Sequence, residues 1–366
     1  MKNKLAFITP NLDVGGAQTM LVRLVKEISK DKYEICVFVR DSELNNYIEK
    51  ELRNQGVKIE FLNLLDNEIK GKKVIFKIKN YFKFQKKIET FNPDIIHVHL
   101  ELFYTLLYGI IKNRKIVMTI HSHPALITTR RLRIMLRILD IKNNLRLVGC
   151  AQLISKEAYK NLLKNKNVIQ TIYNPIVIDN YKKLEETKNN SLDFIYINVA
   201  RLHKIKNQKL LIAAFTGVKK KLPNSKLLIV GDGPLMSELK RLTEELGVSN
   251  SVFFLGNRND VANLLRHSDV FVLSSNSEAC PMTVLEAMAS GLPIISTDVG
   301  GVKELIGDNA GILVETGNVE GYTKALEDIQ KNSKMRHDMG IVSLQRAKQF
   351  SSVLIAKQYE LLYESF

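Results

Sequence analysis

The sequence has no tryptophan, only three cysteines in 366 residues, and no long uninterrupted apolar run. Cys36, Cys150 and Cys280 are widely spaced and odd in number, which excludes a disulfide framework and the common metal-binding spacings. A membrane-spanning helix needs about 20 predominantly apolar residues in a row, and no such run is present. The apolar run after Lys4 stops at Pro10 without a cleavage-like segment, so we predict a buried strand rather than a signal peptide. These absences favour a reducing, cytoplasmic environment.

Acidic residues are scarce in the first half of the chain. The whole sequence carries 54 Lys and Arg against 38 Asp and Glu, a net charge of +16. Residues 1–178 hold 31 of the basic residues and 16 of the acidic ones, a net charge of +15, whereas the remainder holds 23 and 22. Such asymmetry predicts an anionic partner for the first half alone.

The length and the hydrophobic pattern predict two α/β domains. A chain of 366 residues that is 45% apolar can fill two cores of roughly 150–200 residues each. Short apolar strands alternate with helical patterns in the first half, which is typical of a parallel sheet covered on both faces. The strands predicted there are 5–9, 33–39, 58–63, 95–99, 116–120 and 147–150.

The same pattern begins again near residue 192. The strands predicted in the second half are 194–199, 226–230, 252–255, 270–273 and 293–296. The polar segment 180–191 is the expected connection, and residues 323–366 are expected to be helical throughout. We therefore predict doubly wound domains over 1–178 and 179–345, and a C-terminal helix, 346–366, that packs back on the first domain. Ligands of such sheets bind outside the carboxyl ends of the strands.

The most informative stretch is 274–296, where two glutamates flank the start of a predicted helix. Glu278 lies in the loop after a strand, and Glu286 lies in the first turns of a helix that begins near Met282 or Thr283. Free backbone N–H groups at a helix start bind anions such as a diphosphate. Carboxylates beside them accept hydrogen bonds from sugar or ribose hydroxyls. The alternative is that Glu286 merely solvates its helix.

Two cations follow the first strand of the second half. Arg201 and Lys206 flank a short loop before a helix, where both can reach the cleft and offset charge on a departing nucleotide. The alternative is a solvated basic loop. Gly231 and the pair Gly15–Gly16 occupy further strand-to-helix turns, where they let a backbone approach a ligand closely or simply form the turn. The turn at Gly231 lacks the third glycine of a dinucleotide fingerprint.

Four histidines lie at the ends of predicted strands, namely His97, His99, His121 and His123. Two H-x-H pairs permit a metal site, but no cluster of Asp, Glu or Cys accompanies them except Glu101. We therefore expect no bound metal or other cofactor. A histidine that makes a hydrogen bond in the cleft is the favoured interpretation, with His121 as the first choice.

The basic excess concentrates in two amphipathic segments, 70–87 and 130–139. Both resemble segments that lie on anionic membranes, and the cations expected to do so are Lys72, Lys73, Arg130, Arg133 and Arg137. Nucleic acid is a rival partner, because bases could stack on Phe76, Tyr81, Phe82 and Phe84. No nucleic-acid motif is present, so we expect no nucleic-acid partner. A solvated helix face is the third interpretation.

At these residues the sequence resembles the family 4 retaining glycosyltransferases, whose GT-B fold has two Rossmann-like domains facing across a cleft. The likeness covers nearly the whole chain. It rests on Gly15–Gly16, Arg201 with Lys206, the turn Gly231–Pro234, and an E-x7-E segment that ends in E-A-M-A-x-G-x-P. The last motif is highly specific. The resemblance implies a metal-independent enzyme that retains the anomeric configuration.

The resemblance also implies residue roles. Arg201 and Lys206 would bind the donor diphosphate, and Glu286 would bind the nucleotide ribose. The other residues implied at the donor and its transferred sugar are Glu278, Cys280, Met282, Thr283, Gly15, Gly16 and Gly231, with His121 supporting bond breaking. Ala279 and Cys280 stand where Gly-Phe or Gly-Leu is usual in the family, so contacts with the sugar are expected to differ here.

The predicted function is transfer of a hexose or N-acetylhexosamine from a nucleotide sugar, with UDP as the expected nucleotide. The basic first half suits a polyprenyl-diphosphate-linked glycan acceptor of capsule or O-antigen assembly, met at the inner face of the cell membrane. One alternative is a sugar-nucleotide epimerase of the same architecture, which is not expected to combine Arg201 and Lys206 with the E-x7-E segment. The other is a nucleotide-binding protein without turnover, which the intact Glu278 and His121 disfavour.

Overall fold

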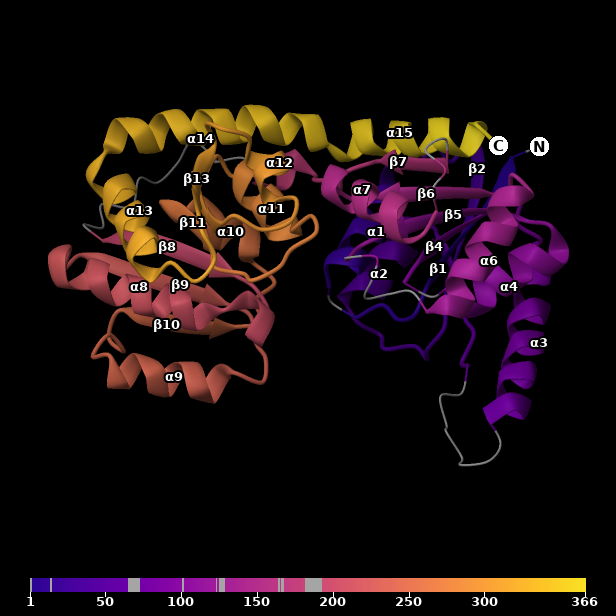
Figure 1. Ribbon diagram of the computed structural model, residues 1–366, viewed down its shortest axis with the longest axis horizontal. Coiled ribbons are helices and arrows are strands. Elements are labelled where there is room, and N and C mark those ends of the chain that lie inside the picture. Colours follow the sequence, from indigo (N-terminus) through magenta and orange to yellow (C-terminus); the bar gives the residue numbers. More distant parts are fainter. Residues whose placement is uncertain are drawn as a thin grey trace. The chain divides into compact units, whose positions relative to one another are not determined.

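The chain forms two compact units. The computed structural model describes residues 2–13, 15–64, 73–100, 102–122, 124, 129–163, 165, 168–181 and 193–366. The first unit comprises Met1–Pro175 together with Ser352–Phe366, and the second comprises Ile176–Ser351. Each unit is a parallel sheet with helices on both faces (Figure 1).

The described residues of the first unit form a seven-stranded sheet in the order β3-β2-β1-β4-β5-β6-β7. Its central strands are nearly continuous apolar runs because helices cover both faces. The order reverses between β1 and β4, which is the point where open parallel sheets bind ligands. The strands are β1 (Asn3–Thr9), β2 (Tyr33–Val39), β3 (Lys58–Phe61), β4 (Ile95–His99), β5 (Lys115–Ile120), β6 (Leu145–Gly149) and β7 (Ile169–Thr171).

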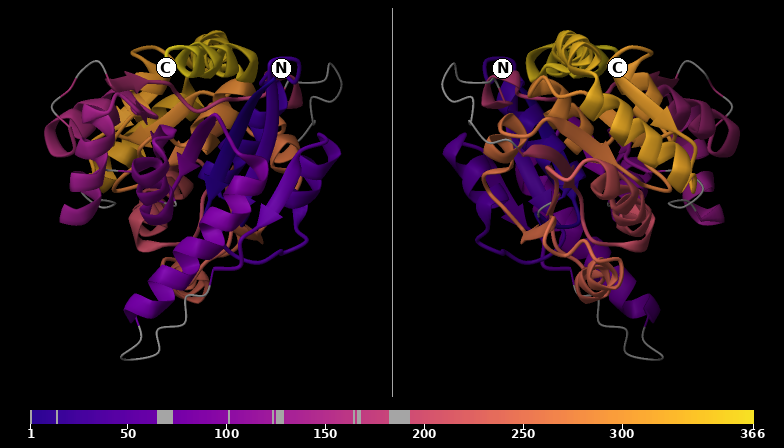
Figure 2. Two further views of the ribbon diagram at one scale, coloured as in Figure 1. Left: turned by 90° about the vertical axis from the view of Figure 1, so that its right-hand side faces the viewer. Right: turned by 90° about the vertical axis from the view of Figure 1, so that its left-hand side faces the viewer.

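Two groups of helices cover this sheet. The helix α1 (Gly16–Glu27) packs on α2 (Tyr47–Asn54) and on α15 (Ser352–Glu364), whereas α4 (Phe103–Lys112) packs on α3 (Lys73–Phe91) and on α6 (Arg130–Ile141). The helix α3 can be followed in the left view of Figure 2. A further helix, α7 (Gln152–Asn161), packs on β6 and β7.

The C-terminal helix α15 is an integral part of the first unit. Its apolar side is buried, with Tyr359, Leu362 and Tyr363 each at most 2% exposed. Polar contacts add to this packing, because the Glu360 carboxylate accepts from the backbone N–H of Ser29 at 2.7 Å. The sequence predicted that this segment packs on the first domain, and its contacts with α1 show the structural basis.

A buried histidine joins α15 to the sheet. His97 is fully buried, with Nδ1 2.7 Å from the hydroxyl of Tyr363 and Nε2 2.7 Å from Oγ1 of Thr119. The same Thr119 oxygen lies 3.1 Å from the hydroxyl of Tyr359. Burial holds the pKa of His97, and that of the neighbouring His99, well below the ordinary histidine value. Both imidazoles are therefore neutral in the folded protein at neutral pH.

The second unit has a six-stranded sheet in the order β10-β9-β8-β11-β12-β13. Its core contains three large aromatic side chains that are fully buried, Tyr196, Phe215 and Tyr322. The hydroxyl of Tyr196 donates to the Leu326 carbonyl at 2.7 Å, so this buried polar group is satisfied. The strands are β8 (Phe194–Val199), β9 (Ser225–Val230), β10 (Val252–Gly256), β11 (Val270–Leu273), β12 (Ile294–Thr297) and β13 (Gly311–Val314).

The helices of the second unit also form two groups. One group is α8 (Gln208–Lys221), which packs on α9 (Met236–Glu245) and α13 (Val319–Lys331). The other group surrounds α11 (Met282–Ala289), which packs on α10 (Val261–Arg266), α12 (Val302–Ile306) and α14 (Ser333–Ala347). Short 3-10 helices are η2 (Ile178–Tyr181), η3 (Lys204–Lys206) and η4 (Lys348–Phe350).

The structure differs from the sequence predictions mainly at element edges. The strands β7 and β13 were not predicted, because they are short edge strands of three and four residues with partly exposed side chains. Residues 323–366 are almost entirely helical, as predicted, but they form several helices rather than one. The helices are separated at Asn332, whose side chain accepts from Met335 N at 2.9 Å and caps α14, and at Ser351. The predicted linker 180–191 falls largely outside the described residues.

The buried histidines predict a loss of stability in mild acid. In the unfolded chain an imidazole takes up a proton near pH 6.5, whereas His97 and His99 stay neutral in the folded chain well below that pH. The unfolded state therefore binds more protons below about pH 6.5, and the free energy of unfolding falls there by up to about 1.4 kcal/mol per pH unit for each histidine. Urea unfolding at pH 7, 6 and 5 measures this slope. The exposed His337→Gln variant is the control and should keep it, while equal stability at pH 7 and pH 5 would contradict the assignment.

Candidate functional site

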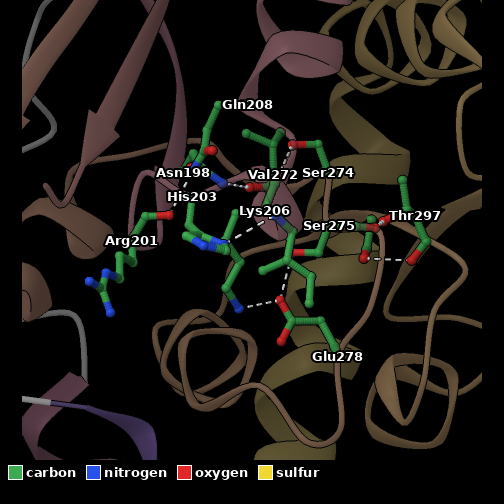
Figure 3. Close-up of polar contacts among 12 residues, drawn as sticks. Asn198, Arg201, His203, Lys206, Gln208, Val272, Ser274, Ser275, Glu278 and Thr297 are labelled. Atoms are coloured by element: carbon green, nitrogen blue, oxygen red, sulfur yellow. Dashed lines mark hydrogen bonds and ion pairs between the residues drawn. The ribbon is translucent and has the colours of Figure 1, made fainter. Parts of the chain in front are cut away.

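The loop between β11 and α11 holds Glu278 in a partly buried ion pair (Figure 3). The Oε1 atom of Glu278 lies 2.6 Å from Nζ of Lys206 and accepts from Oγ of Ser275 at 2.6 Å. The Glu278 side chain is 8% exposed and that of Lys206 is 26% exposed, so water screens this pair less than a surface pair. The Oε2 atom of Glu278 receives no hydrogen bond from the residues that the structure describes, which leaves an acceptor available to a ligand.

Two loops at neighbouring strand ends are tied together by hydrogen bonds. The backbone N–H of Asn276 donates to the Ile205 carbonyl at 2.7 Å, and Oγ of Ser274 donates to the Lys206 carbonyl at 3.0 Å. The amides of Asn207 and Asn276 join the same loops at 3.0 Å. Because β8 and β11 are adjacent in the sheet, these bonds fix the Lys206 loop against the Glu278 loop.

Arg201 lies at the same edge of the sheet but is exposed. Its backbone carbonyl accepts from Nε2 of the buried Gln208 at 3.1 Å, and its side chain points away from the Lys206–Glu278 pair in Figure 3. Within the described ranges its guanidinium pairs with no carboxylate, unlike the ammonium of Lys206. The two cations predicted from the sequence thus lie on one loop. Arg201 is exposed to solvent, whereas Lys206 forms an ion pair with Glu278.

Gly231 and Gly233 are required by the packing of two loops. A Cβ atom on Gly231 would lie 2.1 Å from the Ala200 carbonyl oxygen, and one on Gly233 would lie 2.3 Å from the Leu202 carbonyl oxygen. Gly231 also has φ +126°, which disfavours any residue with a side chain. These glycines let the β9–α9 turn touch the loop that carries Arg201, so they have a structural role whether or not they contact a ligand.

Gly300 makes a similar contact with the Glu278 loop. Its φ is +55°, and a Cβ atom there would lie 1.6 Å from the Glu278 carbonyl oxygen. The next residue, Gly301, donates its N–H to the Ala279 carbonyl at 3.0 Å, and Oγ1 of Thr297 donates to the Ser275 carbonyl at 2.5 Å. The β12–α12 turn therefore packs against the backbone of the Glu278 loop and holds it in place.

The first turn of α11 follows this loop directly. The helix begins at Met282 after Pro281, and no side chain caps it. The first N–H groups of a helix have no partner within the helix and attract anions. Cys280 and Met282 are buried and Thr283 is partly exposed. Glu286 is 9% exposed on the same helix, one turn further on.

In the first unit, His121 follows β5 and contacts a second histidine. Its Nε2 lies 2.8 Å from Nδ1 of His99, which is on the neighbouring strand β4. Burial lowers the pKa of His121 to about 4, so this imidazole is neutral at pH 7. The described residues contain no group of three or more His, Cys, Asp or Glu that could hold a metal ion. His123 and Glu101 lie outside the described residues.

Gly15 and Gly16 lie at the start of α1, directly after β1. Gly15 is the N-cap residue of the helix, with extended backbone and no side-chain cap. A Cβ atom on Gly15 would lie 2.8 Å from Oε1 of Gln18, whose amide bonds to Asn11 at 2.9 Å. This turn is at the carboxyl edge of the first sheet, next to β4, the strand that carries His97 and His99.

The predicted basic surface is partly described. Arg130, Arg133 and Arg137 lie exposed on α6, whose buried side consists of Met135, Leu136 and Leu139. Lys73 begins α3, and Lys72 lies outside the described residues. The case for base stacking on this segment is weakened, because Tyr81 and Phe84 are buried, Phe76 is partly buried and Phe82, at 61%, is the exposed one of the four aromatics. In the described ranges, no helix has the length and apolarity to cross a membrane.

The second unit therefore combines an available carboxylate oxygen, an ammonium, a free guanidinium and a helix start at one sheet edge. Cations and helix N–H groups bind phosphate oxygens, and carboxylates bind hydroxyls, so this edge has the groups that a sugar-phosphate compound requires.

Comparison with known proteins identifies the family. Residues 14–180 match the family model described as Glycosyltransferase Family 4, and residues 179–344 match that described as Glycosyl transferases group 1. The chain belongs to this family of glycosyltransferases and has the GT-B fold. It is 31% identical over 288 residues to N-acetyl-alpha-D-glucosaminyl L-malate synthase of Bacillus anthracis, covering 74% of each chain.

The names of other relatives indicate that those proteins act on lipid-linked sugars. The chain is 27% identical to UDP-Gal:alpha-D-GlcNAc-diphosphoundecaprenol alpha-1,3-galactosyltransferase of Escherichia coli, covering 89% of this chain and 87% of the relative. Among solved structures, Anabaena HepE in complex with UDP-glucose superposes with a TM-score of 0.83 and 20% identity, covering 99% of this chain and 100% of HepE. That likeness shows a shared fold.

Several residues that shape this site were not predicted from the sequence. Ser275 and Gly300 act through contacts between loops that are distant in sequence, and His99 was noted only as part of an H-x-H pair. The Gly300–Gly301 pair after a predicted strand was the available signal, since such pairs mark close backbone approach.

The contact at Gly300 generates a stability prediction. Gly300→Ala places a methyl group on the Glu278 carbonyl and also forces alanine into a left-handed conformation, so the free energy of unfolding should fall by about 3 kcal/mol or more. Gly317→Ala is the matched control, because Gly317 has φ +82° with open space around its Cβ position and should lose only about 1 kcal/mol. Urea unfolding measures both, and equal losses would show that the loop contact is unimportant.

Proposed function

We propose that the protein is a retaining glycosyltransferase that moves a hexose or N-acetylhexosamine from a UDP-sugar to a lipid-linked glycan acceptor in cell-surface polysaccharide synthesis. The observation that carries the proposal is the Lys206–Glu278 pair, fixed at the uncapped start of α11 with one oxygen of Glu278 available. Family membership supports the reaction class.

Each charged group then has a place on the donor. Arg201 and Lys206 bind the diphosphate, aided by the N–H groups at the start of α11. Glu286, on the same helix, binds the ribose hydroxyls. Glu278 and the backbone of 279–283 bind the transferred sugar, so donor binding moves Lys206 from a carboxylate to a phosphate partner.

The chemistry is a front-side displacement. The bond between the anomeric carbon and the diphosphate oxygen breaks, and the acceptor oxygen forms its bond on the same face. The departing phosphate takes the acceptor proton, so no enzyme nucleophile and no metal ion are needed. Arg201 and Lys206 stabilise the charge that develops on the leaving group. His121 is neutral and contributes a hydrogen bond beside the sugar.

Relatives support UDP and a lipid-linked acceptor. The Escherichia coli relative is named for UDP-galactose and a diphosphoundecaprenol-linked sugar, and a Campylobacter jejuni relative is named for transfer to a diphospho-undecaprenol-linked sugar. HepE was solved with UDP-glucose. The exposed arginines of α6 suit the anionic surface at which such acceptors reside, and they support the proposal that the enzyme acts peripherally at the cytoplasmic face of the membrane.

Replacing the two glutamates should affect different steps, UDP binding for Glu286 and turnover for Glu278. Glu286→Ala should weaken UDP binding about 10- to 100-fold, since hydrogen bonds to a charged group contribute about 1.5–3 kcal/mol. Glu278→Ala should lower turnover about 100-fold while UDP affinity changes little. Calorimetric titration with UDP and steady-state kinetics separate the two effects. The exposed Glu315→Ala is the control, and the roles are wrong if both variants change only thermal stability.

Incubation with UDP-sugars alone separates the reaction classes. A transferase should slowly hydrolyse its donor to free sugar and UDP, and the released sugar should keep its anomeric configuration at early times by NMR. Epimerised UDP-sugar would instead show an epimerase, and binding without any product would show a nucleotide-binding protein. Thermal-shift measurements with UDP, GDP and ADP identify the base, because ligand at 100 times its dissociation constant stabilises by about 2.7 kcal/mol.

The arginines of α6 should control membrane binding. Replacing Arg130, Arg133 and Arg137 with alanine removes three exposed charges, each expected to contribute about 1 kcal/mol at an anionic surface. Flotation with vesicles rich in anionic lipid should then recover much less protein than with the unaltered chain. The control replaces three exposed lysines of the second unit, Lys240, Lys303 and Lys334, and should float normally. Equal binding of the unaltered protein to neutral and anionic vesicles would exclude this surface.

A further inference from the structure

His99 is a buried side chain with one unusual ring nitrogen. The residue is 1% exposed, and its Nδ1 lies 2.8 Å from Nε2 of His121. Its Nε2 is buried, and no atom of the described residues forms a hydrogen bond with it. Most buried polar atoms have a partner, so an unpartnered one needs an explanation.

The bond between His99 and His121 has only two possible arrangements. Burial keeps both imidazoles neutral, and a neutral imidazole has one N–H and one lone pair in its ring plane. One ring must therefore donate and the other must accept. If His121 donated, the proton of His99 would be on Nε2, where it would be a buried N–H with no acceptor.

The second arrangement leaves only a lone pair without a partner. With its proton on Nδ1, His99 donates to His121, and the bare Nε2 is the unpartnered atom. Orphaned buried N–H groups are rarer in proteins than under-satisfied acceptors, so this arrangement is favoured. His121 then accepts at Nε2, which places its own proton on Nδ1. His121 is partly exposed as a residue and directly follows β5, at the carboxyl edge of the sheet.

The surroundings of His99 hold the donor ring in place. Phe7 stacks on the His99 ring with ring centroids 6.0 Å apart. The His97 ring also packs against it, with ring centroids 4.2 Å apart. His97 is itself bonded to Tyr363 of α15 and to Thr119 of β5. Thr119 is two residues before His121, so the same polar cluster fixes β5, the strand that His121 directly follows.

We propose that His99 is a positioning residue that fixes His121 in the Nδ1–H tautomer and so aims a hydrogen-bond donor at a hydroxyl of the bound substrate. This rests on the proposed function, in which His121 lies beside the transferred sugar. In the absence of such a partner, His121 could rotate or change tautomer, and its acceptor Nδ1 would repel the lone pairs of a substrate oxygen.

The tautomer is tested without any substrate. Long-range proton–nitrogen NMR of the full chain, labelled with nitrogen-15 at histidine only, distinguishes protonated from bare ring nitrogens. The His121→Asn variant identifies the signals of that residue. We expect His121 to have a protonated Nδ1 and a bare Nε2 at pH 7. A protonated Nε2 on His121 would overturn the proposal, whatever the enzyme turns over.

The positioning role is tested by two substitutions of His99. His99→Asn keeps an N–H donor, because the asparagine amide nitrogen is as far along the side chain as Nδ1 of histidine. His99→Leu fills the space without a donor. We expect His99→Leu to lower kcat for donor hydrolysis about 10- to 100-fold with KM for the UDP-sugar within about twofold, and His99→Asn to restore most of the rate. The exposed His337→Asn is the control and should leave both constants unchanged.

The outcomes separate the proposal from the proposed function. Equal rates for His99→Leu and the unaltered enzyme, or an Asn variant as slow as the Leu variant, would show that the donor at this position is unimportant. A Leu variant that loses rate only through a lowered melting temperature and a raised KM would show a merely structural residue. If the unaltered chain turns over no nucleotide sugar, the proposed function fails, and the NMR result still decides which histidine donates.

Discussion

Close packing of backbone against backbone, at the carboxyl edge of the second sheet, is the constraint on which the candidate site depends. Parallel strands end at a common edge, and the loops that follow β8, β9, β11 and β12 must share the space beyond it. The backbones of these loops touch directly at Gly231, Gly233 and Gly300, because glycine places no side chain between them. Because the loops touch directly, the positions of Arg201, Lys206 and Glu278 are set by the sheet rather than by the flexibility of each loop.

The same constraint explains the electrostatics of the site. Lys206 and Glu278 come from different loops, yet they meet at 2.6 Å because hydrogen bonds such as that between Asn276 and Ile205 hold the loops in register. Each charge offsets the other, which limits the cost of keeping a carboxylate that is 8% exposed. Arg201 has no such partner among the described residues, so it can meet an anion without breaking a bond.

Much of this architecture follows from local patterns in the sequence. The alternation of apolar runs and helices predicted most strands, and the E-x7-E segment located the Glu278 loop, because both are properties of consecutive residues. The short edge strands β7 and β13 were missed, since three or four half-exposed residues carry little periodic signal. The supports of Glu278 and His121 were missed for another reason. Ser275, Gly300 and His99 act through contacts that only the folded chain creates.

The return of α15 to the first unit has a consequence for the order of folding. The residues of the second unit, Ile176–Ser351, are contiguous in the chain, whereas the first unit is completed by Ser352–Phe366. During synthesis the ribosome therefore releases the whole second unit before two partners of the His97 cluster exist, because Tyr359 and Tyr363 follow that unit in the chain. Until α15 is made, the side of α1 that packs on it is uncovered. His97 and Thr119 also lack the tyrosine hydroxyls that α15 supplies. The first unit thus stays incomplete while the whole second unit is made, and the addition of α15 is the step that completes its fold.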